Sequence, residues 1–216
     1  AVPGYQIEVV DVMGDQVVAN ESGNVVIKLP LPPGTLTTLW QNEQRYVDSY
    51  LSMYPGYYLT GDAGYKDDDG YLYIMSRIDD IINVAGHRLS TGRFEEVLCQ
   101  HDAVAEAAVI GVEDELKGQV PLGLVVLKKG VTLDEQELNK QLMALVRKEI
   151  GPVAAFRLVS AVQKLPKTRS GKILRGTMRN IADNKKYNVP ATIEDPATLD
   201  IVRNTLTRMG YADAHV

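Results

Sequence analysis

The sequence predicts an α+β fold in two parts, and three observations support this prediction. Residues 1–76 alternate apolar and polar side chains in short strand-like segments, with one helical pattern among them. Residues 81–190 instead alternate apolar strands with amphipathic helices. Between them lies a short polar and charged segment, residues 77–80, where the composition changes. We therefore expect a β-rich part, a hinge at this segment, a small α/β lobe and a polar tail over residues 191–216.

The β-rich part contains four strand patterns and one helix pattern. Residues 42–53 place four apolar side chains from Tyr46 to Leu51 at helical spacing, and Asn42 is a suitable N-cap. The last two strands are joined by Lys-Asp-Asp-Asp-Gly, which is typical of a hairpin turn. Four strands with a single helix indicate a small barrel or a sandwich-like unit. The expected strands are residues 5–10, 24–29, 57–65 and 70–75.

Helices in the α/β lobe have recognisable beginnings and ends. A Ser-Thr pair at 90–91 can cap a first helix that runs to about residue 100. Asp134 opens a capping box for a second helix, and Gly151-Pro152 ends it. From residue 183 the chain is polar and expected to be extended, apart from a helical pattern over 200–209. The other expected elements are a helix over 173–182 and strands over 81–84, 104–112, 120–127 and 157–162.

Composition excludes several classes of protein. A chain of 216 residues, 45% of them hydrophobic, can form one domain or two small ones around a core. The net charge of -5 argues against a nucleic-acid binder, which normally has a basic surface. There is neither a signal sequence nor an apolar run of about 18 residues, so we expect no membrane partner. The single cysteine, Cys99, indicates a reducing compartment, the cytoplasm or, in a eukaryote, the mitochondrial matrix.

One basic segment contrasts with the acidic chain. Between Lys164 and Ala182 there are six basic residues and no acidic one. Such a local positive field suits a small anion. The pair Ser170-Gly171 lets the chain bend, so that Lys172 can present a compact, mobile cation to phosphate or carboxylate oxygens. A solvated basic turn before a helix is the alternative explanation.

Three motifs follow one another along the chain: YLTGD at 58–62, RIDDIINVAGHRL at 77–89 and PKTRSGK at 166–172. Together, and in this order, they resemble signatures of the acyl-CoA synthetases, a family of adenylate-forming ligases. The segments GHRLST, GPVAAF and PKTRSGKILR are more similar to the short-chain members of acetyl and propionyl type. GPVAAF in particular looks more like propionyl-CoA synthetase than acetyl-CoA synthetase.

The resemblance implies how the two parts are related. Residues 1–76 would be the end of a large N-terminal adenylation domain, and residues 81–190 the mobile C-terminal domain. Asp79 would be the hinge at which backbone torsions change between two reaction steps. Ser76 stands where many relatives have glycine, which puts the freedom of that hinge in question. The family's phosphate loop and acyl pocket lie outside these residues, so the resemblance implies a C-terminal portion that is inactive alone.

The resemblance also assigns residues to nucleotide binding. Asp62 would accept hydrogen bonds from the ribose hydroxyls, Arg77 would bind the ribose, and Arg88 the phosphate end. Lys172 would bind the nucleotide too and act as the catalytic residue, bridging carboxylate and phosphate oxygens while the adenylate forms. Structural alternatives are an ordinary turn aspartate at position 62, and arginines paired with neighbouring aspartates.

Residues for CoA are implied in the same way. Ala85 and Gly86 would border the tunnel for the pantetheine arm, and Arg147 would reach a CoA phosphate. The alternatives are a plain hairpin turn and a cation that complements the dipole at a helix end. His101 would hold a metal cation, as this region does in some relatives, whereas capping the preceding helix is its structural alternative. Cys99 is expected to be a small core residue.

The reaction that the resemblance implies has two steps. A short-chain carboxylate, propionate or acetate, attacks the α-phosphate of ATP held with Mg²⁺, giving an acyl-adenylate and pyrophosphate. The thiol of CoA, the co-substrate, then attacks the acyl carbon and AMP leaves. Further partners would be the rest of the N-terminal domain and a protein acylation and deacylation machinery acting on Lys172. Two alternatives are an adenylation domain that loads a carrier protein, and a non-enzymatic module that binds an anion or nucleic acid.

Overall fold

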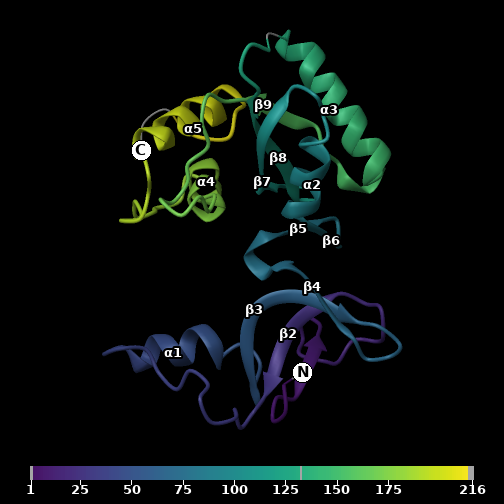
Figure 1. Ribbon diagram of the computed structural model, residues 1–216, viewed down its shortest axis with the longest axis vertical. Helices are drawn as coiled ribbons and strands as arrows, with labels where there is room; N and C mark the ends of the chain where they lie inside the picture. Colours follow the sequence, from purple (N-terminus) through teal and green to yellow (C-terminus); the bar gives the residue numbers. More distant parts are fainter. Residues whose placement is uncertain (1, 132, 214–216) are drawn as a thin grey trace. The chain divides into compact units, whose positions relative to one another are not determined.

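The computed structural model describes residues 2–131 and 133–213 (Figure 1). The chain divides between Asp79 and Asp80 into two compact units, here called unit 1 and unit 2. Unit 1 is rich in strands and unit 2 alternates strands with helices, which confirms the mixed α and β fold predicted from the sequence. Among the described residues, no helix is long and apolar enough to cross a membrane.

Unit 1 is built on one antiparallel sheet of four strands, in the order β1-β2-β3-β4. Its single helix, α1 (Glu43–Tyr50), lies between β2 and β3 in the sequence. The sheet differs from the expected barrel or sandwich, because β1 and β4 do not pair with each other and the sheet stays open. The strands are β1 (Ile7–Val10), β2 (Gly23–Lys28), β3 (Tyr57–Lys66) and β4 (Leu72–Arg77).

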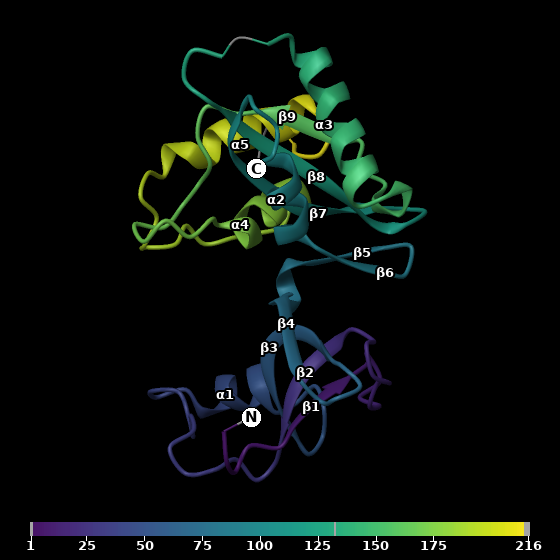
Figure 2. The same cartoon turned by 45° about the vertical axis from the view of Figure 1, so that its right-hand side comes forward.

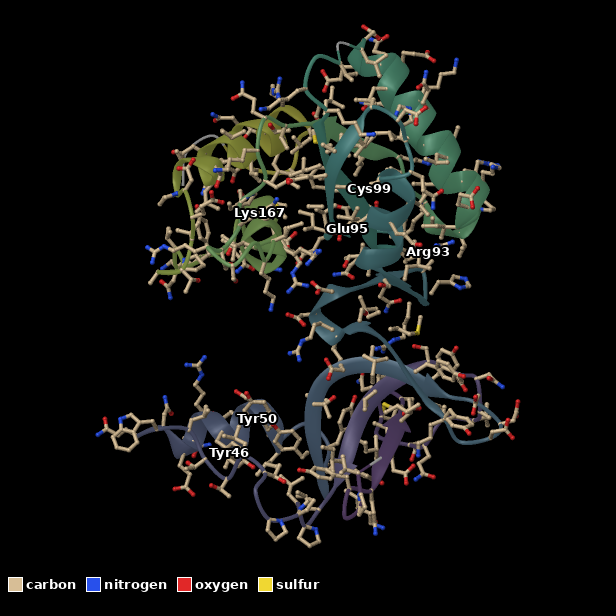
Figure 3. The ribbon with its side chains drawn as sticks, viewed as in Figure 1. Tyr46, Tyr50, Arg93, Glu95, Cys99 and Lys167 are labelled. Carbon is tan, nitrogen blue, oxygen red and sulfur yellow. The ribbon has the colours of Figure 1, made fainter. Side chains whose placement is uncertain are left out.

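Helix α1 begins where the sequence predicts. The Asn42 side chain accepts a hydrogen bond from the backbone N–H of Arg45 and so caps the helix. The Tyr50 ring of the helix then stacks on Tyr58 of β3, with ring centroids 5.1 Å apart and planes nearly parallel. Figure 3 shows Tyr50 beside Tyr46, whose ring also lies against Tyr58. These aromatic contacts fix the helix against the strand that leads to Asp62.

Unit 2 contains a five-stranded sheet around the long strand β8. One edge of β8 pairs with β7 along ten residue pairs, while β5 and the parallel strand β9 also pair with it. Strand β6 pairs only with β5, and it forms because the chain turns back at Ala85-Gly86. The strands are β5 (Ile81–Val84), β6 (His87–Ser90), β7 (Val104–Asp114), β8 (Gly118–Leu127) and β9 (Leu158–Ala161).

Helices cover both faces of this sheet (Figures 1 and 2). Alternate residues of β7 face opposite sides, so Val109 packs with α2 and α3 while Ile110 packs with α4 and α5. On the first side the core is filled by Phe94 and Leu142, on the second by Met178. The helices are α2 (Thr91–Leu98), α3 (Glu135–Glu149), α4 (Arg175–Ala182) and α5 (Ala197–Arg208).

Helix boundaries agree with the sequence prediction at α3 and differ at α4. The Asp134 carboxylate accepts hydrogen bonds from two backbone N–H groups of the first turn of α3, as the capping box predicts. Helix α4 begins at Arg175, two residues later than expected. The reason is an antiparallel bridge between Lys167 and Ile173, which holds Ile173 in an extended conformation.

Helix α5, near the end of the chain, confirms the helical pattern predicted over 200–209, although it begins three residues earlier. Helix α5 starts after Pro196 and buries Leu199, Val202 and Leu206 in the second core of unit 2. These residues recur every three to four positions, so one helical face is apolar although the segment as a whole is polar. The division of the chain into domains made from the sequence stays a prediction.

Cys99 is not the core residue that the sequence indicated. It is the C-cap of α2, and the residue is exposed there although its thiol lies beside Ala107 of β7. Partial burial, and then the nearby Glu95 carboxylate, raise the pKa of its thiol, so the group is neutral at neutral pH.

Candidate functional site

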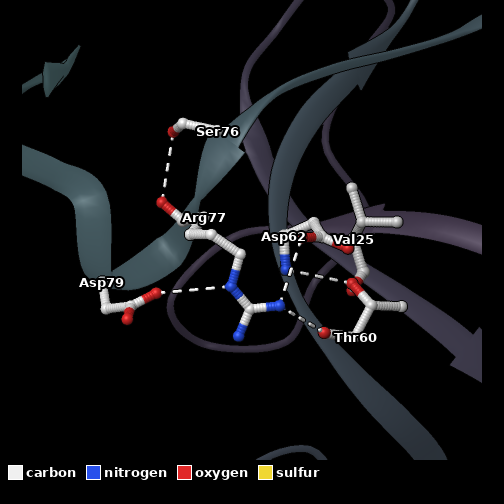
Figure 4. Close-up of polar contacts among 6 residues, drawn as sticks. All are labelled: Val25, Thr60, Asp62, Ser76, Arg77 and Asp79. Carbon is white, nitrogen blue, oxygen red and sulfur yellow. Dashed lines mark hydrogen bonds and ion pairs between the residues drawn. The ribbon is translucent and has the colours of Figure 1, made fainter. Parts of the chain in front are cut away.

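In unit 1, two of the expected nucleotide-binding residues lie in contact. Asp62 of β3 and Arg77 of β4 are opposite each other in the sheet register, and their side chains form an ion pair at 3.3 Å (Figure 4). The same guanidinium nitrogen of Arg77 also donates to the carbonyl of Thr60. The Nε of Arg77 is 3.5 Å from Oδ1 of Asp79, the expected hinge residue. A fixed guanidinium and a half-exposed carboxylate are thus presented together at one end of the sheet.

Gly61 makes this arrangement possible. Its φ of +80° is a left-handed conformation, and a Cβ at this position would collide with the Arg77 guanidinium. Only glycine therefore lets Arg77 lie across the backbone of β3. Next to it, the Thr60 hydroxyl donates to Val25 and accepts from the Asp62 backbone, which fixes the loop that carries the carboxylate. The YLTGD motif contains this glycine, but the motif alone did not predict a role for it.

In unit 2, the hairpin between β5 and β6 carries the residues expected to border a pantetheine tunnel. Ala85 and Gly86 both have positive φ, at 49° and 89°, and both are exposed. The backbone N–H of Ala85 donates to the carbonyl of Lys117 at 2.9 Å, which ties the turn to the connection between β7 and β8. Arg88 follows on β6, half-buried and opposite Asn83.

Arg147 lies in a hollow lined by four cations. This hollow, called the basic cleft, contains Lys117, Lys140, Arg147 and Arg157 and has a volume of about 330 Å³. Lys140 and Arg147 are two turns apart on one face of α3. No carboxylate lines the cleft, and none of the four cations has a carboxylate partner among the residues that the structure describes. Although the chain has a net negative charge, four positive side chains lie together in this cleft. The positive charge of the cleft suits a ligand with several negative charges.

Lys172 lies at the end of a loop whose backbone is held in place. The Thr168 hydroxyl accepts from the Lys172 N–H at 3.1 Å, and the Thr168 N–H donates back to the Lys172 carbonyl at 2.9 Å. Gly171 completes this tight turn with a φ of +85°. The Lys172 side chain is exposed, and its ammonium forms no hydrogen bond or ion pair with the described part of the chain. The ammonium is therefore available to an anion outside unit 2.

Three other cations of the basic segment are paired with carboxylates within unit 2. Lys167 donates to Glu106 of β7 at 2.6 Å, and Lys164 lies 3.5 Å from Glu194. Arg175 is held by carboxylates as well. The sequence predicts a positive field along the whole segment, but these carboxylates cancel much of it. Within one loop, Lys167 is paired with a carboxylate and Lys172 is not.

His101 makes two local hydrogen bonds. Its Nδ1 accepts from the Ala103 N–H at 3.2 Å, so the ring proton lies on Nε2, which donates to Gln141 of α3 at 2.8 Å. The ring thus joins the end of α2 to α3. Within residues 2–131 and 133–213, no three His, Cys, Asp or Glu residues are grouped so that they could hold a metal ion. The metal role expected for His101 stays a prediction without a supporting ligand set.

Comparisons with known proteins agree with these motifs. The model of the AMP-binding enzyme C-terminal domain matches residues 93–172. The mitochondrial acyl-CoA synthetase short-chain family member 3 of Mus musculus is 50% identical over 205 residues, which cover 95% of this chain and 30% of that protein. The acetyl-coenzyme A synthetase of Pyrobaculum arsenaticum is 46% identical over 198 residues, or 92% of this chain and 29% of its own length.

A solved structure shows a similar fold. The anthranilate CoA ligase AuaEII in complex with anthranoyl-AMP matches with a TM-score of 0.66 and 30% identity, over 82% of this chain and 33% of that one. The chain spans about a third of the length of the proteins that it matches. By these matches the chain carries the AMP-binding enzyme C-terminal domain and, along nearly its whole length, is similar to a C-terminal part of the short-chain acyl-CoA synthetases.

Proposed function

We propose that this chain is part of an ATP-dependent ligase that joins a short-chain carboxylate, propionate or acetate, to CoA. The observation that carries this proposal is the exposed ammonium of Lys172 on a loop with a fixed backbone. In the first step a carboxylate oxygen bonds to the α-phosphorus of ATP, held with Mg²⁺, and the bond to pyrophosphate breaks. Lys172 stabilises the negative charge shared by the carboxylate and phosphate oxygens, while Asp62 and Arg77 hold the ribose.

In the second step CoA reacts with the acyl-adenylate. The thiolate bonds to the acyl carbon and AMP leaves with the bonding electrons. Rotation at Asp79 withdraws Lys172 and brings the turn at Ala85-Gly86 to the nucleotide, where its small side chains leave room for the pantetheine arm. Arg88 binds the phosphate end. The basic cleft supports the assignment of Arg147 to a CoA phosphate, because its four cations face no competing carboxylate.

Free CoA is favoured over a carrier protein as the acceptor. The nucleotide end of CoA carries three phosphate groups, which the charge of the basic cleft complements, whereas a carrier protein presents only the pantetheine arm and one phosphodiester. Substituting a carrier protein for CoA in the second step distinguishes the two. We place the complete enzyme in the cytoplasm or the mitochondrial matrix, where an acylation and deacylation machinery can neutralise Lys172 and so switch off the first step.

The direct test uses the complete protein that contains this chain. We expect pyrophosphate release from ATP in the presence of acetate, propionate or butyrate, with the fastest rate identifying the substrate. Lys172→Ala should slow adenylate formation about a hundred- to thousandfold, because one preorganised donor is lost. It should leave thioester formation from supplied acyl-adenylate within about threefold of the unaltered enzyme. Equal loss of both half-reactions would remove the role assigned to the lysine.

A further inference from the structure

Arg175, the first residue of α4, is held between two carboxylates. It makes a bidentate pair with Glu95 of α2, with Nε donating to Oε1 at 2.8 Å and Nη2 to Oε2 at 2.6 Å. Its third nitrogen is 3.9 Å from Asp80. Side-chain exposures of 21% for Arg175, 14% for Glu95 and 24% for Asp80 show that all three charges are largely removed from water. Pairs of this kind are stronger and more directional than surface ion pairs.

The position of this cluster in the chain is specific. Asp80 directly follows Asp79, the residue assigned to the hinge, and Arg175 follows the Lys172 loop by three residues. The base of that loop is closed beside Arg175, where Leu174 donates to the carbonyl of Pro166 at 3.0 Å. One guanidinium therefore joins the first residue after the hinge to the base of the loop.

Glu95 connects the cluster to the rest of unit 2. Its Oε1 also accepts from the backbone N–H of Val109 in β7, at 2.9 Å. The carboxylate, marked on α2 in Figure 3, thus fixes Arg175 against the sheet as well as against the helix. The hydrogen bonds that Arg175 donates to Glu95 raise the pKa of the guanidinium against the opposing effect of burial, so the cation stays charged.

We propose that Arg175 is a positioning residue that transmits the rotation at Asp79 to Lys172, an inference that rests on the proposed function. The turn at Gly86 follows Asp80 on the same hairpin, so it moves with the hinge through covalent continuity. Lys172 is more than 90 residues further along the chain. Its distance from the hinge depends on non-covalent contacts, and Arg175–Asp80 is one that reaches the residue next to Asp79. Loss of Arg175 should therefore disturb the step that needs Lys172 more than the step that needs Gly86.

The test compares both half-reactions in the complete enzyme. We expect Arg175→Met to lower the rate constant for adenylate formation by about 10- to 100-fold, because a displacement of about 1 Å at the reacting groups has this effect. The KM for ATP and the rate of thioester formation from supplied acyl-adenylate should change by less than about threefold. Arg175→Lys should restore part of the loss, since a single ammonium can meet only some of the oxygens.

Lys185 provides a matched control. It lies just beyond the other end of α4 and also bridges two carboxylates, Glu113 at 2.6 Å and Asp183 at 3.0 Å. Lys185→Met should leave both half-reactions unchanged, because this cluster touches neither the loop nor the residue after the hinge. Asp80→Asn keeps the Arg175–Glu95 pair, so it tests the link to the hinge in a protein whose helix contacts are intact. We expect it to slow adenylate formation by about 3- to 10-fold and to spare thioester formation.

Three outcomes would overturn the inference. Equal losses of both half-reactions in Arg175→Met and Asp80→Asn would indicate a purely structural cluster. Unchanged adenylate formation in both variants would show that Lys172 is positioned by other contacts. If the unaltered enzyme forms no acyl-adenylate from any carboxylate, the proposed function itself fails, and that result is distinguishable because it precedes any substitution.

Discussion

Arg77 owes its position to contacts with three neighbours, Thr60, Asp62 and Asp79, and to the missing side chain of Gly61. The resemblance of the motifs was sufficient to assign Asp62 and Arg77 each to the ribose, because both belong to short patterns that can be read along the chain, but it did not predict their pairing. The neutralisation of the basic segment was not predictable in this way. Glu106 is 61 residues from Lys167 in sequence and Glu95 is 80 residues from Arg175, so only the folded sheet brings the partners together.

Gly61→Ala tests whether Arg77 is held for the nucleotide. The new Cβ would push the guanidinium away from Thr60 and Asp62, so we expect the KM for ATP in the complete enzyme to rise about tenfold, equivalent to one lost polar contact. Gly70→Ala is the control, since Gly70 has nearly the same φ, +81°, and no atom within 4 Å of the added group. Both variants should lose about 1–2 kcal/mol of stability from the left-handed backbone. A similar KM in the two variants would contradict the role of Gly61.

At the scale of whole elements, α3 and β5 were predicted closely, α4 and α5 were predicted with starts that differ by two and three residues, and β6 was not predicted. Asp134 is a local signal that acts within one turn, so the start of α3 is encoded near the residue itself. Strand β6 exists because a turn with two positive φ values returns the chain to β5, and α5 because a distant sheet offers it an apolar face. The strand and the sheet against which β6 and α5 form lie in other parts of the sequence. The sequence of each segment alone therefore does not determine its bounds.

The role of the basic cleft in binding CoA can be measured with one cation from helix α3, Lys140, and one from outside it, Arg157. Lys140→Gln and Arg157→Gln should each raise the KM for CoA about 3- to 10-fold, with the effect shrinking at high salt as screening increases. Adenylate formation should not change. Lys148→Gln is the control, because Lys148 lies in the last turn of the same helix, pairs with Glu149 and does not line the cleft. An unchanged KM for CoA in both cleft variants would exclude the cleft as a CoA site.

Helix α5 is expected to be an integral part of unit 2. Leu206 is fully buried in its second core, so Leu206→Ala should lower the free energy of unfolding by about 2–4 kcal/mol in a urea titration of this chain. Leu116→Ala, at a position that is 94% exposed, should change it by less than about 0.5 kcal/mol. Equal stability of the two variants would mean that α5 is dispensable for the fold.

At the scale of the molecule, the chain is two units that each carry residues assigned to the proposed function. Unit 1 offers the Asp62–Arg77 pair, and unit 2 offers Lys172, the turn at Gly86 and the basic cleft. The family could be recognised from sequence because its motifs are short and ordered. The acyl chain length could not, because the resemblance implies that the acyl pocket of the family lies outside these residues. Unit 1 also exposes the large side chains of Trp40, at 89%, and Tyr71, at 68%.

The two lysines of the PKTRSGK loop differ in a way that matters to any reagent that acylates amines. Lys167 is 22% exposed and held by Glu106, so this ion pair must break before its nitrogen can meet a reagent. Lys172 has no such competitor in the described chain. Two lysines five residues apart thus differ in access: the Lys167 amine is shielded and the Lys172 amine is accessible. A reagent that acylates amines would therefore prefer Lys172 without recognising the sequence around it.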